Sequence, residues 1–511
     1  SVRQTTFFPE FTQVAERMRQ EALSVIERFG GIEHMLEMAN ALDRLGLAYI
    51  VQGLAELGCP TQPGASLTVE ALLNEHQVKP HYRLLLRRLF NILETYAYVE
   101  LQTPEAAIIK QPLSVTGLRS SWADALAQFP GAYAELSLIR NCGSCLAAVL
   151  KGEIDPLQLL FPDGSSTLAE HVYTDSPSNL PYLYMVREAV AMIAEALPLG
   201  RRLRILEIGA GTGGLTTHVL PLLPKDNVSY VFSDISGAFF IAAEQRFNDC
   251  DFIDYRLLNI EKSPLEQDFS ADSFDLILAS NVLHATADLK TALRNIHQLL
   301  TPQGALIVLE AELRSPWVDI VFGLTEGWWR FKDFDLRPDY PLIKRQQWRQ
   351  VLSDCGFINT VFTGDLAEVH ADSPQLIFLA QAAKEEIGER DDRLARPTDD
   401  NPASVHWLIF ADRQGTAAAL QDYLAQHRYA ATLLLPGEDS RTIADGVWSI
   451  KPGDKAQLDQ ACRSILTSKR FNIVHLWSLD SEPLDSDGYP AMLKANSVAS
   501  HTILYLIQCL D

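Results

Sequence analysis

The feature that most constrains the fold is an apolar segment that runs directly into a glycine-rich turn. Residues 203–208 have the pattern of a buried strand, and glycines at 209, 211, 213 and 214 follow before a helical pattern begins near Leu215. Glycine permits positive φ angles and lets a ligand approach bare backbone, while the start of the helix supplies unpaired N–H groups. In an open α/β sheet this is where a nucleotide-like ligand binds.

Strand and helix patterns alternate around this turn. The spacing predicts helices over 215–223, 238–247 and 289–300, and strands over 203–208, 229–233, 252–258, 274–279, 305–309, 357–362 and 375–380. Such an order predicts a parallel sheet with helices on both faces, and the short link between the last two strands favours an antiparallel pair. We therefore expect an α/β, Rossmann-like core over residues 165–383.

The regions on either side have different patterns. In residues 1–164, apolar side chains such as Phe11, Val14 and Met18 recur at helical spacing, which predicts an all-α region. Residues 384–404 are charged and read as a linker, and residues 405–511 read as a small, truncated α/β unit. The chain has no initiator methionine, and we expect it to be a piece of a longer protein.

Composition excludes several classes of protein. The net charge of −22 opposes non-specific binding to nucleic acid, whose phosphates require a basic face. No apolar run approaches the roughly 18 residues of a membrane span, and the first residues lack the features of a signal peptide. Seven cysteines in 511 residues indicate reduced thiols and a cytoplasmic location. Cys142 and Cys145 form a lone CxxC, and we expect no metal site.

The spacing of the glycines leaves two ligands open. Gly209, Gly211 and Gly214 satisfy the dinucleotide pattern GxGxxG, whereas Gly213 completes a tighter GxGxG. In either case Asp234 follows at the end of the second strand, where a carboxylate can accept hydrogen bonds from ribose hydroxyls. The spacing by itself does not separate a nicotinamide dinucleotide from S-adenosylmethionine.

The segment Glu-Ile-Gly-Ala-Gly-Thr-Gly at 207–213 resembles the first motif of the class I S-adenosylmethionine-dependent methyltransferases. Asp234 matches their ribose-binding acid, and residues 299–306 are similar to their segment entering the fifth strand. Asn259 stands where the family usually has an aspartate that contacts adenine, and its amide can still bond an adenine edge. The resemblance implies a cofactor site made of Glu207, Gly209, Ala210, Gly211, Thr212, Gly213, Asp234, Ile235, Asn259, Ile260, Ser280 and Asn281.

A more specific resemblance lies downstream. Residues 280–286 (Ser-Asn-Val-Leu-His-Ala-Thr), Leu309-Glu310 and Gly327-Trp328-Trp329 resemble the C-methyltransferase domains of polyketide synthases. By this resemblance, residues 1–164 are a helical lid, and residues 405–511 are a structural, non-catalytic ketoreductase subdomain. The last unit contains no GxGxxG and no Tyr-x-x-x-Lys, so we expect it not to bind NADP.

The resemblance also implies a reaction: transfer of a methyl group from S-adenosylmethionine to the α-carbon of a β-ketoacyl chain on an acyl carrier protein. His284 would be the general base and Glu310 its partner in a catalytic dyad, with Glu312 as a competing carboxylate. Tyr173, Tyr182, Trp328 and Trp329 are candidates for binding the substrate.

Partners would be the phosphopantetheine arm of the carrier and covalently linked synthase domains. A basic patch for the acidic carrier is expected at Arg83, Arg87 and Arg88, or at Lys344, Arg345 and Arg349. The alternatives are an inactive, structural methyltransferase-like domain of a megasynthase and a small-molecule O-methyltransferase. A dehydrogenase is disfavoured by the motif around His284.

Overall fold

The computed structural model describes residues 7–363, 374–384, 406–412, 415–426, 430–444, 446–452, 454–465 and 471–477. The chain divides into two compact units, residues 1–386 and residues 387–511, which we describe separately. The expected linker, residues 384–404, lies outside the described residues except for Lys384.

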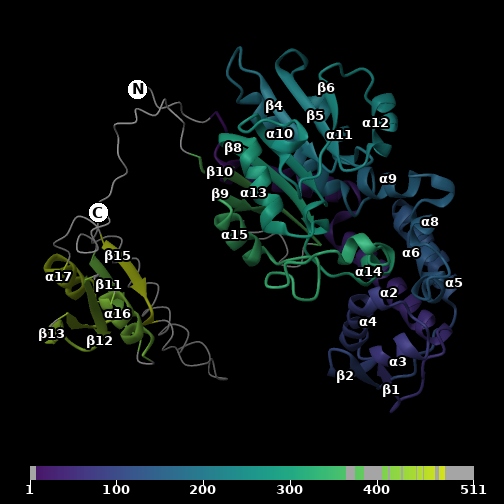
Figure 1. Ribbon diagram of the computed structural model, residues 1–511, viewed down its shortest axis with the longest axis horizontal. Coiled ribbons are helices and arrows are strands. Elements are labelled where there is room, and N and C mark those ends of the chain that lie inside the picture. Colours follow the sequence, from purple (N-terminus) through teal and green to yellow (C-terminus); the bar gives the residue numbers. More distant parts are fainter. Residues whose placement is uncertain are drawn as a thin grey trace. The chain divides into compact units, whose positions relative to one another are not determined.

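A seven-stranded sheet forms the core of the first unit (Figure 1), in the order β6-β5-β4-β7-β8-β10-β9. The first five strands in this order are parallel, and β10 is antiparallel to both of its neighbours. The predicted parallel sheet with an antiparallel pair is thus confirmed. The strands are β4 (Leu203–Ile208), β5 (Val228–Asp234), β6 (Ile253–Leu257), β7 (Phe274–Ser280), β8 (Leu300–Ala311), β9 (Phe357–Phe362) and β10 (Gln375–Ala382).

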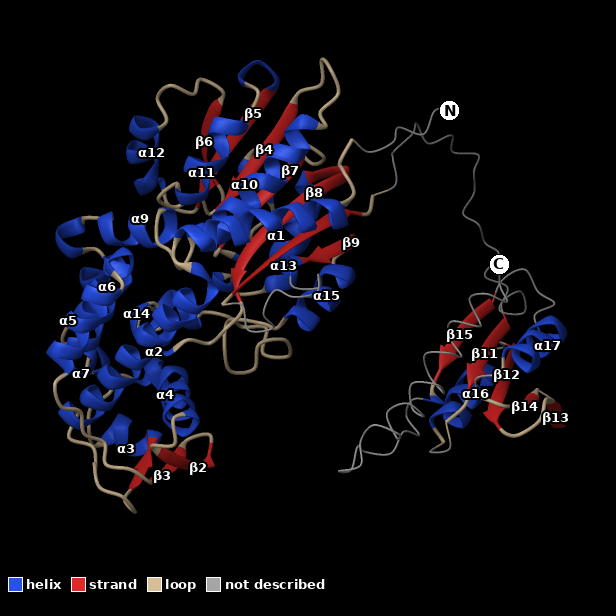
Figure 2. Ribbon diagram, turned by 180° about the vertical axis from the view of Figure 1, so that it is seen from behind, coloured by secondary structure: helices blue, strands red, loops and turns tan. Residues whose placement is uncertain are grey.

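Helices cover both faces of this sheet, as the alternation of patterns predicts. One face carries α1 (Phe11–Arg28), α10 (Leu180–Glu195), α11 (Gly214–Val219) and α12 (Phe240–Arg246). The other carries α13 (Leu289–Leu299) and α15 (Arg345–Asp354). Figure 2 shows α1 and α10 lying across the first face. Fully buried aliphatic side chains such as Ile205, Leu276 and Ile307 fill the first face, because β4, β7 and β8 are covered on both sides.

Residues 31–164, which we call the lid, pack into a second hydrophobic cluster at one end of the unit (Figure 1). The helix α14 (Pro316–Val321), which follows β8, packs against this cluster and ties the lid to the core. A short helix, α9 (Thr167–Thr174), leads back to the core. The other lid helices are α2 (Gly31–Glu56), α3 (Val69–Asn74), α4 (Arg83–Thr95), α5 (Leu118–Gln128), α6 (Tyr133–Ser144), α7 (Leu146–Leu150) and α8 (Pro156–Leu160).

The structure differs from the predicted all-α lid of residues 1–164 in two respects. First, α1 packs on α10 and belongs to the hydrophobic cluster of the sheet, because its buried stripe of Val14, Met18 and Ala22 faces that helix. Second, the lid includes a small antiparallel sheet of β1 (Ser66–Thr68), β3 (Ala106–Ile109) and β2 (Val99–Thr103). These strands are too short to have a readable alternation in the sequence.

The second unit contains a five-stranded sheet in the order β13-β14-β12-β11-β15, parallel except for β13. Its described part agrees with the expected α/β pattern, and the helix expected near residues 497–510 lies outside the described residues. The elements are β11 (His406–Phe410), α16 (Thr416–Gln426), β12 (Ala430–Pro436), β13 (Arg441–Ala444), β14 (Val447–Ile450), α17 (Lys455–Ile465) and β15 (Phe471–His475).

Within the residues described, no helix combines the length and apolar character needed to cross a bilayer. Cys142 lies on α6 and Cys145 follows the end of that helix, and both are free thiols. Burial raises the pKa of the Cys142 thiol to about 12, so this group is protonated at neutral pH.

Candidate active site

The carboxyl ends of five neighbouring strands bring the predicted site residues to one edge of the sheet. In the order of the sheet, these ends carry Asn259 after β6, Asp234 on β5, the glycine turn after β4, His284 after β7 and Glu310 on β8. An elongated ligand that lies along this edge can therefore contact Asp234, the candidate ribose-binding acid, with one part and His284 with another part.

The glycine turn joins β4 to α11 with Gly209, Gly211 and Gly213 all at positive φ. A Cβ atom at Gly209 would overlap the side chain of Val282, which belongs to the loop that carries His284. The absence of a side chain thus lets the turn and the histidine loop approach each other closely. Two hydrogen bonds hold the turn: the Ala210 N–H donates to Ser233 O at 2.9 Å, and Thr212 O accepts from the side chain of Arg246 at 2.8 Å.

Asp234 lies directly beside this turn. Its Oδ2 accepts a hydrogen bond from the Gly211 backbone N–H at 3.0 Å, and its Oδ1 accepts one from Ser236 at 2.9 Å. Burial raises the pKa of this carboxyl above its ordinary value. A carboxylate fixed in this way can accept hydrogen bonds from the ribose hydroxyls of S-adenosylmethionine. The bare backbone of the glycine turn beside it leaves room for the amino-acid portion of the cofactor.

Glu207 has a different place from the one expected. Its carboxylate is 1% exposed, and its Oε2 accepts hydrogen bonds from Thr216 Oγ1 and Tyr230 OH, both at 2.5 Å. By strand alternation the side chain points beneath the turn, where it supports α11, so any contact of Glu207 with a ligand above the turn would not be made by its carboxylate. Burial raises the pKa of Glu207 to about 7.

This buried acid predicts a pH-dependent stability. Folding raises the pKa of Glu207 from 4.5 to about 7. The contribution of this group to the free energy of unfolding is therefore fully present below pH 4.5 and is lost as the pH rises through 7. The loss should reach about 3 kcal/mol of unfolding free energy. Urea unfolding between pH 5 and pH 8 should show it for the wild type and not for Glu207→Gln. The exposed Glu195→Gln is the control, and an unchanged pH dependence in Glu207→Gln would contradict the assignment.

The adenine side of the edge is formed by the loop after β6. Asn259 Oδ1 accepts a hydrogen bond from the Glu261 backbone, and its own N–H donates to Gln267 Oε1 at 2.8 Å, so the loop is held in one shape. Ile260 is 5% exposed and packs in the core, which makes it a support for the loop. Ile235 is 59% exposed beside Asp234, where an apolar side chain can cover a flat base.

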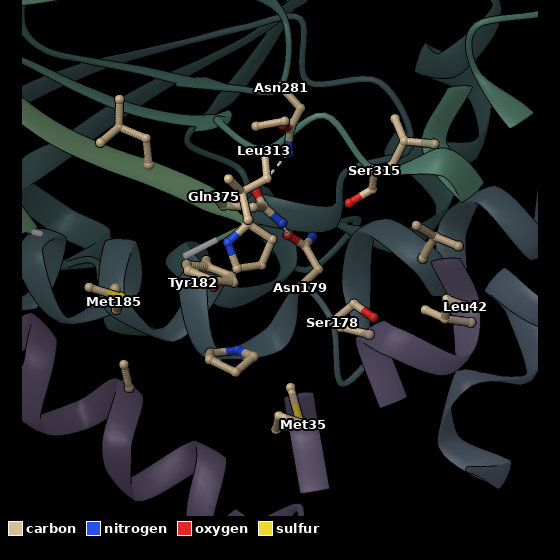
Figure 3. Close-up of a pocket in the computed structure, with 18 of the residues that line it drawn as sticks. Met35, Leu42, Ser178, Asn179, Tyr182, Met185, Asn281, Leu313, Ser315 and Gln375 are labelled. Atoms are coloured by element: carbon tan, nitrogen blue, oxygen red, sulfur yellow. Dashed lines mark hydrogen bonds between the residues drawn. The ribbon is translucent and has the colours of Figure 1, made fainter. Parts of the chain in front are cut away.

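At the end of β7 the chain turns sharply. Ser280 is the last residue of the strand, and Asn281 adopts a positive φ of 49° with its N–H donating to Leu309 O at 2.7 Å. The side-chain amides of Asn281, Gln375 and Asn179 form a hydrogen-bonded row (Figure 3). Asn281 Nδ2 donates to Gln375 Oε1 at 3.3 Å, and Gln375 Nε2 donates to Asn179 Oδ1 at 2.8 Å.

His284 and Glu310 are in direct contact. The His284 Nδ1–H donates to Glu310 Oε2 at 2.5 Å, and the other carboxylate oxygen accepts backbone N–H groups from Val282 and Leu283. Glu310 thus fixes both the ring and the turn that carries it, and Nε2 is the ring nitrogen left to act on a ligand. Glu312, the competing carboxylate, pairs with Arg345 at 3.2 Å instead.

A buried arginine holds the same turn from the opposite side. Arg337, 1% exposed, donates from Nη1 to His284 O at 2.9 Å and from Nη2 to Thr286 O at 2.8 Å. Its Nε donates to Asp333 Oδ1 at 2.6 Å, and Asp333 Oδ2 accepts the N–H of Leu289 at the start of α13. The turn is therefore clamped between a carboxylate and a guanidinium.

Three of the four aromatic candidates lie at the site. Tyr173, Tyr182 and Trp328 line a common cavity with His284, and the Trp328 ring meets the His284 ring edge-on at 5.0 Å between centroids. Burial, with the nearby charge of Glu310, raises the pKa of Tyr173 to about 12, so its hydroxyl remains a hydrogen-bond donor. Trp329, the fourth candidate, does not line this cavity: its Nε1 donates to Gly323 O at 2.7 Å and its ring packs against Tyr340.

The cavity has a volume of about 260 Å³ and lies between the edge of the sheet and helices α1 and α2 (Figure 3). Its lining is mainly apolar, with His284, Asn281 and Gln375 among the polar groups. An apolar hollow with a few converging polar groups is the usual form of a small-molecule site.

Several residues at the site have no signal in the sequence. Arg337, Asp333, Gln375 and Asn179 belong to no recognisable motif, and only the fold brings them to the histidine turn or the cavity. Asp333 and Arg337 come from a loop, Asn179 from the residue before α10, and Gln375 from the start of the antiparallel strand β10, so a search for motifs at the ends of the parallel strands could not have found them.

The arginines of the first expected basic patch are all paired with acidic side chains. Arg83 and Arg87 both pair with Glu105, and Arg88 forms an ion pair with the buried Asp319 at 2.8 Å. These arginines are neutralised within the lid and at its seam with α14, because acidic side chains distant in the sequence pack against α4.

Comparisons with known proteins agree with this geometry. The family profile described as a methyltransferase domain matches residues 206–306. The citrinin polyketide synthase of Monascus ruber is 33% identical over 318 residues, which are 61% of this chain and 12% of that protein. The chain thus spans a small fraction of the length of this curated relative.

Two solved structures resemble the first unit. The CurJ carbon methyltransferase is 38% identical with a TM-score of 0.68, and the match covers 73% of this chain and 99% of that one. The CMeT domain of the citrinin polyketide synthase is 28% identical with a TM-score of 0.63, over 74% and 99% of the two chains. This chain therefore belongs to the S-adenosylmethionine-dependent carbon methyltransferases of polyketide synthases.

Proposed function

We propose that this domain methylates the α-carbon of a β-ketoacyl chain carried as a thioester on an acyl carrier protein. In this proposal His284 is the general base and Glu310 orients it. The observation that carries the proposal is the 2.5 Å contact between His284 Nδ1 and Glu310 at the wall of an apolar cavity, on the same sheet edge as the glycine turn.

The residues suit a reaction at carbon. The α-proton of a β-ketoacyl thioester is acidic because two carbonyl groups flank it. His284 Nε2 takes this proton, and the Glu310 carboxylate stabilises the resulting imidazolium. S-adenosylmethionine, when bound, supplies an electrophilic methyl group on a positive sulfur. The electron pair of the broken C–H bond forms the new carbon–carbon bond, and that of the broken carbon–sulfur bond stays on sulfur.

The surroundings of the dyad support the same chemistry. The apolar wall excludes water from the developing negative charge, and Tyr173 is a protonated donor that can approach the enolate oxygen. The lid, residues 31–164, covers the cavity on the side opposite the sheet edge. We also propose that residues 405–511 act as a scaffold for neighbouring synthase domains.

The decisive experiment uses a β-ketoacyl carrier protein as substrate. Incubated with the protein and S-adenosylmethionine, the carrier should gain the mass of one methyl group in place of one hydrogen, measured by intact mass spectrometry. Mild acid treatment of the product should leave the added mass in place, because a methyl group bonded to carbon is stable to acid whereas a methyl enol ether is hydrolysed; this step separates carbon from oxygen methylation.

Two outcomes would contradict the proposal. Loss of the added methyl group in mild acid would indicate an O-methyltransferase. Absence of S-adenosylmethionine binding by calorimetry, in the same folded protein, would indicate a domain that only spaces its neighbours.

A further inference from the structure

The wall of the cavity opposite the sheet is unusual in composition. Met35, Met38, Ala39 and Leu42 line the cavity from α2, and Met185 lines it from α10. Spacings of three and four residues place the α2 residues on one face of that helix. Three of the six methionines in the whole chain thus lie on one small cavity.

The side chains that α2 contributes to the lining are all apolar and offer no polar group to the amides of a pantetheine arm. Thioether side chains are unbranched and polarisable, so a methionine surface adjusts to apolar ligands of different shape. The α2 residues differ in exposure: Met38 and Leu42 are 3% and 2% exposed, while Met35 and Ala39 are half-buried. The buried side chains of Met38 and Leu42 are therefore fixed, and the half-buried Met35 has room to adapt.

We propose that this wall, formed by Met35, Met38, Ala39, Leu42 and Met185 and called the acyl pocket below, binds the hydrocarbon tail of the acyl substrate. The inference rests on the proposed function and adds the substrate class to it. The domain favours β-ketoacyl chains that extend several carbons beyond the β-carbonyl, and it tolerates branches on them. The polar row of Asn281, Gln375 and Asn179 lies across the cavity from α2, so the chain has one apolar side on which to lie (Figure 3).

The test compares pantetheine thioesters of 3-oxobutanoate, 3-oxohexanoate and 3-oxooctanoate. In the wild type, kcat/KM should rise by about fourfold for each added methylene, the factor that burial of one CH2 group provides. Ala39→Phe places a ring in the acyl pocket and should abolish this rise, so that the ratio of kcat/KM between the 3-oxooctanoyl and 3-oxobutanoyl thioesters falls to about one. Binding of S-adenosylmethionine, measured by calorimetry, shows that the variant is folded.

Ala55→Phe is the matched control, because Ala55 is exposed near the other end of α2 and does not line the cavity. This variant should keep the wild-type dependence on chain length. Equal loss for all three thioesters in Ala39→Phe, with normal S-adenosylmethionine binding, would place the pantetheine arm on this wall and overturn the inference. So would a wild type that methylates all three equally. If the wild type methylates none of them, the proposed function fails instead.

Discussion

Replacing His284 by alanine should reduce methyl transfer by about 10²- to 10⁴-fold, the usual contribution of a general base. The binding of S-adenosylmethionine should remain, because Asp234 and the glycine turn lie on other strands and do not contact the imidazole. The rate is measured by mass spectrometry of a β-ketoacyl carrier protein, and cofactor affinity by calorimetry. The physical reason is that no other neutral base in the described cavity lining can take the α-proton.

His81→Ala is the matched control, since His81 is exposed in the lid and does not line the cavity. It should leave both the rate and the cofactor affinity unchanged. If His284→Ala kept the wild-type rate, His284 would not be the general base, and its contact with Glu310 would be structural only. If it lost cofactor binding as well, the histidine turn would have a structural role in the cofactor site.

Replacing Arg337 by methionine should lower the free energy of unfolding by about 3–5 kcal/mol, the cost of removing one partner from a buried ion pair. The change leaves Asp333, 9% exposed, without its guanidinium, and it leaves the carbonyl oxygens of His284 and Thr286 without donors. Urea unfolding measures the effect. Under conditions in which the variant is folded, methyl transfer should also fall, because the histidine turn has then lost the two hydrogen bonds that hold the carbonyl groups of His284 and Thr286.

A double-mutant cycle separates the buried charge from the lost carbonyl contacts. Asp333→Asn combined with Arg337→Met should recover part of the loss, because the amide can still accept the N–H of Leu289 without a charge to bury. Arg17→Met is the surface control: its ion pair with Glu188 is half-exposed and should contribute less than about 1 kcal/mol. A cost for Arg337→Met as small as for this control would show that the clamp carries no net stability.

Much of the core could be predicted from the sequence because its signals are local. The run from β4 through the glycine turn into α11 is contiguous, so strand pattern, glycine spacing and helix start reinforce one another within about a dozen residues. The same holds for the turn that carries His284. The position of Asp234 also followed from the sequence, since the carboxyl ends of parallel strands share one edge of a sheet.

Other features could not be predicted because they depend on contacts between distant residues. The apolar stripe of α1 shows that the helix is buried and does not show against which surface, and the structure places it on α10. Glu207 has the sequence position of a cofactor ligand, yet strand alternation and two buried hydroxyl groups direct its carboxylate into the core. Trp328 and Trp329 are adjacent, and only the first reaches the cavity.

The sequence by itself determined the succession of strands and helices along the chain, the ligand-binding edge of the sheet and the candidate active groups, because each of these depends on residues that are neighbours along the chain. Only the tertiary structure decided how the active groups are held and what shape of substrate they can meet. Arg337 reaches the histidine turn across 53 residues of chain, and α2 forms a cavity wall for a site more than 200 residues away. Such contacts arise from the packing of whole surfaces, which no local pattern encodes.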